Sequence, residues 1–251
     1  MVWAYDSHIH LSDPAYENEI HHTLNTMDNV KIKACCVSMN YENSLQTLNL
    51  AKKSCHVLPF VGIHPEYADD DLEFMKGIIH DNVDTISGIG EIGIDPTFVK
   101  SEDDDKRQIH VFESLLALAE RYQKPVSIHS RKSLDKIFEI MTSYTINHVS
   151  LHWFDGSKKH LKTAMNMGFF VSFGPVMIYA NDKQSLISKA DPSRILVETD
   201  GPVAFSRCFE MKHAQISFIP SVIFCASKIL GKSYDEMATL LEENSKSYLG
   251  I

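Results

Sequence analysis

The stretch VWAYDSHIH, residues 2–10, opens on apolar and β-favouring residues and closes on two histidines. Seven further apolar runs follow, each separated from the next by enough chain for one helix; they span residues 32–39, 57–64, 85–94, 125–130, 149–154, 169–173 and 195–199. Nearly continuous apolar strands that alternate with helices are typical of a parallel sheet. Eight such units predict an α/β fold in which the sheet closes into a (β/α)8 TIM barrel.

The length of the chain agrees with this fold, because its 251 residues match the roughly 250 that one such barrel needs. We find no linker, low-complexity stretch or internal repeat, and we expect a single domain over residues 1–251. The sequence has neither a run of about 18 apolar residues nor a basic-then-apolar leader, which predicts a cytoplasmic protein without membrane association. The five cysteines form no CxxC pair, and we expect them to be reduced core residues.

The charge of the chain limits how it can bind nucleic acid. Lysine and arginine number 24 against 33 aspartates and glutamates, which gives a formal net charge of -9. Affinity for phosphate comes mainly from Lys and Arg, so this balance argues against a protein that grips long duplex DNA through a broad basic surface. Any nucleic-acid substrate must therefore be held locally.

Capping and periodicity mark two helices most clearly. Apolar residues repeat at three- and four-residue spacing between residues 103 and 122, and acidic residues 103–105 lie at the start, where they complement the helix dipole. Ser233 and Glu236 form a capping-box pattern, which predicts the start of the final helix.

Metal-competent side chains end several of the predicted strands. His8 and His10 are two residues apart in a strand, so their side chains point the same way, into the barrel mouth. Two close imidazoles suit a metal ion, although an isolated HxH is more often a surface or hydrogen-bonded core pair. Glu91 lies between glycines in GEIG and would be costly in the lumen unless a cation compensated it. The alternative for Glu91 is a solvated side chain in a tight turn.

Three further residues of this kind are His129, His152 and Asp200, which end the fifth, sixth and eighth runs; Glu198 is expected to face inward beneath Asp200. Five of the eight predicted strands thus end in a potential ligand, at the face where TIM-barrel active sites are built. Four imidazoles and two carboxylates favour Zn, Mn, Co or Ni over an all-oxygen cage for Ca or Mg, although Mg stays among the candidates. Two such ions would make the pocket cationic and favour an anionic substrate.

These residues belong to motifs that together resemble the TatD family of metal-dependent deoxyribonucleases, within the amidohydrolase-like barrels. The matching motifs are HIH (8–10), GIHP (62–65), GEIGID (90–95), PVSIHSR (125–131), HWFDGS (152–157) and VETDGP (197–202). The resemblance extends along essentially the whole chain. It implies a TIM-barrel hydrolase that holds two divalent metal ions.

The resemblance also assigns roles to individual residues. The implied ligands are His8, His10 and Asp200 for one ion, His129 and His152 for the other, and Glu91 as the bridge between them. His64 would contact the scissile phosphate, and Asn244 matches an asparagine in the family's final helix.

The implied reaction is hydrolysis of a phosphodiester by a metal-activated water, with Asp200 as a ligand and general base. The predicted substrate is DNA, cut from single-stranded ends as by a 3'-5' exonuclease, because the mouth of a barrel admits one strand more readily than a duplex. Basic residues in loops after the strands would hold flanking phosphates, unless they are ordinary surface charges; these are Arg131, Lys132, Lys158 and Arg207.

The chain departs from the family pattern at three places, all in loops. Gly201 stands where the family often has Ser, and Pro96 follows GID where an aromatic residue is common. Residues 205–219 lack the asparagine-containing stretch that usually follows the eighth strand. The departures put substrate choice in question rather than metal binding, because loops supply specificity while strand ends supply chemistry.

Two other functions remain open. The same metals would serve an amide or ester hydrolase, for example one that cleaves an aminoacyl-tRNA bond, and the net charge of -9 favours this alternative. The second alternative is a non-catalytic subunit of a larger assembly that retains an unused site. The chain also resembles the nuclease component of some bacterial antiphage systems. This resemblance implies protein partners in a defence or repair system.

Overall fold

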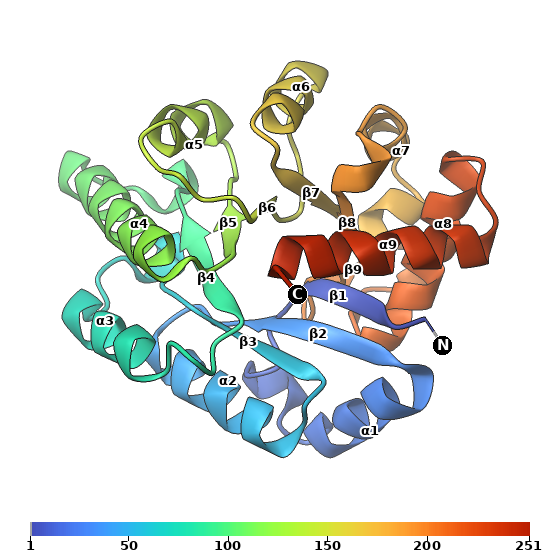
Figure 1. Ribbon diagram of the computed structural model, residues 1–251, viewed down its shortest axis with the longest axis horizontal. Coiled ribbons are helices and arrows are strands. Elements are labelled where there is room, and N and C mark those ends of the chain that lie inside the picture. Colours follow the sequence, from blue (N-terminus) through green and yellow to red (C-terminus); the bar gives the residue numbers. More distant parts are fainter. Residues whose placement is uncertain (1) are drawn as a thin grey trace.

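The eight predicted strands form one parallel sheet in the computed structural model, which describes residues 2–251 (Figure 1). The strands are β1 (Ala4–Ile9), β2 (Ile32–Val37), β3 (Val57–Val61), β4 (Gly88–Gly93), β5 (Val126–His129), β6 (Val149–Leu151), β7 (Phe170–Phe173) and β8 (Ile195–Val197). Each strand pairs in parallel with the next along the chain, from β1 to β8. The prediction of a TIM barrel is confirmed.

Helices surround the sheet and connect its strands (Figure 1). They are α1 (Ile20–Val30), α2 (Tyr41–Lys53), α3 (Leu72–Asp81), α4 (Glu102–Tyr122), α5 (Leu134–Met141), α6 (Lys158–Asn166), α7 (Asn181–Ile187), α8 (Ile219–Ile229) and α9 (Tyr234–Leu249). Both predicted helix starts are confirmed: four acidic residues occupy the first turn of α4, and Ser233 and Glu236 form a capping box on α9.

The alternation of side chains along the strands produces two separate cores. In β2, Ala34 and Cys36 belong to a large outer core between sheet and helices, whereas Cys35 and Val37 belong to a smaller inner core. The inner core fills the barrel with side chains from four other strands as well, namely Tyr5, Phe60, Phe170 and Leu196. Tyr248 of α9 joins this core and donates a hydrogen bond to the carbonyl of Val126, 3.1 Å away. The end of α9 therefore covers the barrel opposite its mouth.

The seam between β1 and β8 is closed largely by one side chain. The Asp6 carboxylate accepts hydrogen bonds from the backbone N–H of His8 (3.1 Å) and from the backbone N–H and hydroxyl of Thr199 (3.0 and 2.5 Å). Just beyond β8, the backbone N–H of Asp200 donates to the carbonyl of His8 at 2.9 Å. Asp6 is fully buried, and burial raises its pKa to about 7. The Asp6 side chain thus joins the first strand to the last, at the point where the strand-to-strand pairing of the sheet ends.

Two of the five cysteines contradict the expectation of core residues. Cys35 and Cys36 are buried and Cys225 is half-buried, but Cys55 and Cys208 are exposed. All five are free thiols, as expected. Cys55 lies in the turn before β3, and Cys208 lies in the short helix η6 (Arg207–Phe209) of the segment that follows β8.

Over residues 2–251, no single helix is long and apolar enough to cross a membrane. Two helical segments reach the required length and apolar composition only when they are taken together, and the chain bends by 109° between them; they are Ile216–Ile229 and α9.

We predict that Asp6→Ala destabilises the barrel by at least about 2 kcal/mol, because three buried donors lose their acceptor. For a chain of this size a loss of about 2 kcal/mol lowers the melting temperature by roughly 4–8 °C. Asp6→Asn retains one side-chain oxygen and should lose less. The matched control is Asp28→Ala, since Asp28 is exposed and its ion pairs with Lys31 and His56 lie on the surface. Equal melting temperatures for Asp6→Ala and the control would contradict the closure role.

Candidate metal centre

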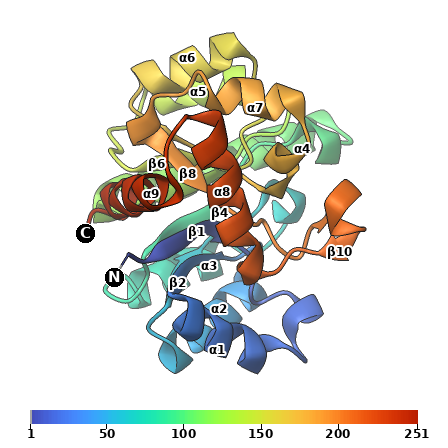
Figure 2. The same ribbon diagram turned by 90° about the vertical axis from the view of Figure 1, so that its right-hand side faces the viewer.

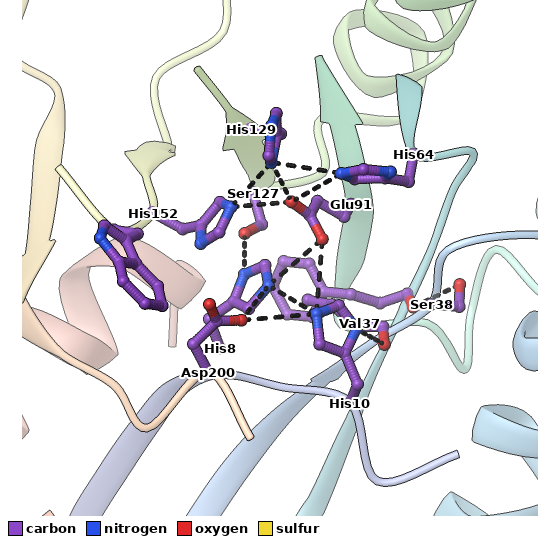
Figure 3. Close-up of polar contacts among 12 residues, drawn as sticks. His8, His10, Val37, Ser38, His64, Glu91, Ser127, His129, His152 and Asp200 are labelled. Carbon is purple, nitrogen blue, oxygen red and sulfur yellow. Dashed lines mark hydrogen bonds and ion pairs between the residues drawn. The ribbon is translucent and has the colours of Figure 1, made fainter. Parts of the chain in front are cut away.

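The six candidate ligands converge at the carboxyl ends of the strands (Figure 3). They are His8, His10, Glu91, His129, His152 and Asp200, from β1, β4 and β5 and from the segments that follow β1, β6 and β8. Five of the six are buried, and His129 is nearly so. The structure therefore brings together residues that are separated by as many as 192 positions in the sequence, from His8 to Asp200.

Glu91 lies at the centre of this cluster, and its two carboxylate oxygens face different histidines (Figure 3). Oε2 lies 3.4 Å from His8 Nε2 and 3.5 Å from His10 Nε2. Oε1 lies 2.8 Å from His129 Nδ1 and 2.7 Å from His152 Nε2. Burial by itself would raise the pKa of Glu91, but the surrounding imidazoles hold it well below its usual value. The carboxylate is therefore ionised and placed between two groups of nitrogen donors.

Asp200 lies on the His8 and His10 side of the cluster. Its Oδ1 is 3.6 Å from His8 Nε2 and 3.5 Å from His10 Nε2. One donor atom from each of His8, His10 and Glu91 lies within 4.8 Å of the other two. Imidazole nitrogens combined with carboxylate oxygens at this spacing fit a borderline divalent ion such as zinc.

Partners outside the cluster orient three of the imidazoles. His10 Nδ1 donates to the carbonyl of Val37 at 3.2 Å, and His129 Nε2 donates to Asp95 Oδ2 at 2.9 Å. His8 Nδ1 lies 2.9 Å from the Ser127 hydroxyl. Each contact engages one ring nitrogen and leaves the other ring nitrogen facing Glu91. The rings are thus held in the orientation that metal binding requires.

Sequence reasoning did not assign these orienting partners. Asp95 was visible only as the last residue of GEIGID, four positions after Glu91. The structure places Asp95 fully buried against His129, where hydrogen bonds to that ring and to Thr97 outweigh burial and lower the Asp95 pKa to about 2. Ser127 had a weaker signal, since it precedes His129 by two residues and therefore faces the same side of β5.

His64 joins the cluster but turns its proton-bearing nitrogen toward the other side chains. Its Nδ1 accepts a hydrogen bond from the backbone N–H of Glu66 at 3.1 Å, at the start of the short helix η2 (Pro65–Tyr67). The proton of the neutral ring therefore sits on Nε2, which lies 3.3 Å from His129 Nδ1 and 3.7 Å from Glu91 Oε1. Burial lowers the pKa of His64 to about 3, so the ring is neutral. His64 can thus act as a hydrogen-bond donor beside the cluster.

Glu198 is buried behind the cluster, as expected from its position two residues before Asp200. It accepts a hydrogen bond from the backbone N–H of Trp153 at 2.7 Å and another from the Ser172 hydroxyl. Burial raises its pKa to about 8. Glu198 therefore holds the turn that carries His152 and Trp153.

The basic residues that were predicted to contact phosphate lie at different places in the structure. Arg131 lines a cavity of about 430 Å³ together with His129, His152 and Asp200. Lys132, the next residue, lines a different hollow beside Asp135 and Lys136. Arg207 is exposed in η6 (Arg207–Phe209), and Lys158 begins α6 on the surface. Asn244 lies away from the cluster and donates to the carbonyls of Pro192 and Ile195, which attaches α9 to β8.

Two departures from the family pattern have a common structural cause. A side chain added at Gly201 would clash with the Tyr16 hydroxyl and come within 2.7 Å of the Ala214 carbonyl. Tyr16 donates to that carbonyl at 2.5 Å, and Ala214 belongs to the unusual segment of residues 205–219. This segment forms the short hairpin of β9 (Ala204–Phe205) and β10 (Lys212–His213). Figure 2 shows the segment at the end of the molecule opposite α9.

The fold and the cluster define a metal-dependent hydrolase barrel, and comparison with known proteins specifies the family. The family described as TatD related DNase matches residues 5–250, so the chain belongs to the TatD family. Human deoxyribonuclease TATDN3 is 26% identical over 211 residues, which cover 78% of this chain and 77% of that protein. A protein of Erwinia amylovora named 3'-5' ssDNA/RNA exonuclease TatD is 22% identical, covering 84% of this chain and 86% of its own.

A solved structure shares the whole fold. The crystal structure of the TatD homologue YJJV from Escherichia coli k12 superposes with a TM-score of 0.89 at 22% identity and covers 99% of this chain and 98% of its own. The chain is therefore a TatD-family metal-dependent hydrolase on a TIM barrel, with a site whose donor atoms fit metal ions.

We predict that Gly201→Ser destabilises the fold by about 1–3 kcal/mol, because the added side chain overpacks the site against Tyr16. Removing the hydroxyl in the double variant Gly201→Ser/Tyr16→Phe should recover part of this loss. The control is Gly77→Ser in α3, where an added Cβ meets no atom within 4 Å. The stability of the parent and of the three variants is measured by urea unfolding. An unfolding midpoint of Gly201→Ser equal to that of the control would show that the packing conflict is absent.

Proposed function

We propose that this chain hydrolyses phosphodiester bonds at single-stranded DNA ends with two divalent metal ions. The observation that carries this proposal is the position of Glu91, whose two oxygens each face a separate set of histidines. A carboxylate shared in this way suits a pair of ions. The ions would be drawn from Zn, Mn, Co, Ni and Mg.

The geometry supports a division of ligands. His8, His10 and Asp200 would hold one ion beside Glu91 Oε2, and His129 and His152 would hold the other beside Oε1. When bound, the ions would polarise the phosphate and lower the pKa of an attacking water. Asp200 would take up the proton of that water through its carboxylate, which His10 keeps ionised by hydrogen bonding against the opposing effect of burial on its pKa.

His64 would bind a phosphate oxygen rather than a metal ion. Its Nδ1 is occupied by the Glu66 N–H, so Nε2 carries the proton toward the cluster. A metal ligand needs a lone pair at that position, whereas a phosphate oxygen needs a donor. The tautomer therefore supports substrate binding, with Arg131 on the cavity wall as a second phosphate contact.

The charge distribution supports exposed strand ends as substrate. The chain has a net charge of -9, so positive charge would concentrate at the loaded centre and Arg131 instead of spreading over a duplex-binding surface. The human and Erwinia relatives are named as a deoxyribonuclease and as a single-strand exonuclease. An amide or ester hydrolase and a non-catalytic subunit are the alternatives, and protein partners in defence or repair stay a prediction.

We predict that the purified protein binds two transition-metal ions per chain, measured by mass spectrometry of metals after dialysis against zinc or manganese. Glu91→Ala should lose both ions, because it removes the shared ligand, and His129→Ala should lose one. His110→Ala is the control, since His110 is exposed on α4. A stoichiometry near zero in the unmodified protein would contradict the two-metal proposal.

We predict that Asp200→Asn lowers turnover at least about 100-fold while circular dichroism and metal-free melting stay close to those of the parent protein, because size is kept and the base is removed. Asp182→Asn on the surface of α7 is the control. Turnover is measured on a linear single strand of DNA and on a closed circle of the same sequence. RNA and an aminoacyl ester are tested as alternative substrates. Cleavage of the circle at the linear rate would exclude end-directed action, and hydrolysis of the ester alone would favour the alternative enzyme.

A further inference from the structure

A row of aromatic rings leads away from the metal centre along the loop that follows β8. Trp153 stacks on Phe205, with centroids 5.5 Å apart and an interplanar angle of 22°. Phe205 meets Phe209 at 6.1 Å, and Phe209 stacks on Phe218 at 4.7 Å. The three phenylalanines belong to β9, η6 and η7 (Ile216–Phe218), within the segment that departs from the family pattern. This segment therefore supports Trp153 with a packed apolar backing.

Trp153 stands where this row meets the active-site cavity. The residue lines the cavity of about 430 Å³ together with His129, His152 and Asp200. Phe205 stacks against the indole, and Trp153 is half-buried in the cavity wall. The volume lies within the ~300–1,000 Å³ typical of small-molecule sites. A planar group in this cavity would stack on the indole beside the candidate ligands.

The backbone holds Trp153 in one place. Its φ of 41° lies in the left-handed region, which a bulky side chain rarely adopts. The backbone N–H of Trp153 donates to Glu198 Oε1 at 2.7 Å, and Glu198 is itself held by the Ser172 hydroxyl. Two anchors, one on the backbone and one on the ring, thus fix the direction of the indole. The Trp153 indole is therefore a flat surface that is already in place before a ligand binds.

We propose that Trp153, backed by Phe205, is a stacking subsite for the nucleobase next to the hydrolysed phosphate, while Arg131 in the same cavity binds that phosphate. This inference rests on the proposed function, because it takes a nucleic acid as substrate. Every base has a π-face that stacks on an aromatic side chain, so the subsite tolerates any sequence and accepts bases of DNA and RNA alike. A base inside a duplex is already stacked, which explains a preference for unpaired ends.

The kinetic test compares an oligonucleotide with ordinary terminal nucleotides and one with abasic residues at both ends. We expect the parent enzyme to favour the base-bearing strand by about 5- to 100-fold in kcat/KM, the range that loss of one stacking contact produces. Trp153→Ala should cut both strands at the rate at which the parent cuts the abasic one, with the change mainly in KM. Trp153→Tyr should retain part of the preference. A base preference that survives in Trp153→Ala overturns the inference.

The control variant is Trp3→Phe, because Trp3 is the only other tryptophan in the sequence and lies before β1, far from the cluster, where its ring packs at a tilt against His56 with centroids 4.7 Å apart. This variant should keep the parent's preference for base-bearing ends. Its fluorescence then reports Trp153 alone, which gives a binding test that needs no turnover.

In the Trp3→Phe background, deoxyadenosine monophosphate should quench the fluorescence of metal-loaded protein to saturation. Deoxyribose 5-phosphate, which lacks a base, should not. Adenosine monophosphate distinguishes RNA from DNA as the source of the base. If no strand is cleaved, the proposed function fails, yet saturable base-dependent quenching would still support the subsite. Absence of quenching by both nucleotides, or equal quenching by the base-free phosphate, would overturn it.

Discussion

The need to compensate one buried carboxylate organises the centre of this protein. Glu91 is almost fully enclosed by the barrel, where an unpaired charge is strongly unfavourable. Imidazoles from neighbouring strands and loops surround it, and its two oxygens divide them into two sets. The orienting contacts of Val37, Ser127 and Asp95 follow from that arrangement, because each turns an imidazole nitrogen toward the carboxylate. The site is therefore built outward from Glu91.

Closure of the barrel and assembly of the site depend on the same segment. Asp6 binds Thr199, and the next residue, Asp200, donates its N–H to the carbonyl of His8. The contacts that join the first and last strands thus also set the distance between Asp200 and the histidines at the end of β1, His8 and His10. A change that loosens this seam would affect stability and catalysis together, which is typical of a barrel whose catalytic residues come from several strand ends.

The segment after β8, residues 205–219, makes two packing contacts near the mouth of the barrel. Ala214 engages the Tyr16 hydroxyl and leaves room only for glycine at position 201, while Phe205 supports Trp153 beside the cavity. Gly201 and residues 205–219 thus meet through Tyr16 and Ala214, although these positions looked unrelated in sequence. Loops at the mouth of a barrel generally supply specificity, whereas the strand ends supply the chemistry.

The sequence by itself determined the alternation of strands and helices, the barrel they form and the six residues that meet at its mouth. These features depend on local periodicity and on strand polarity, which a single chain displays directly. Only the tertiary structure decided which groups orient them: Ser127 reaches His8 across 119 positions, and Arg131 lines the cavity while its neighbour Lys132 does not. It also decided the tautomer of His64 and the exposure of Cys55 and Cys208. Such properties depend on contacts between distant elements, and local sequence patterns carry no record of those contacts.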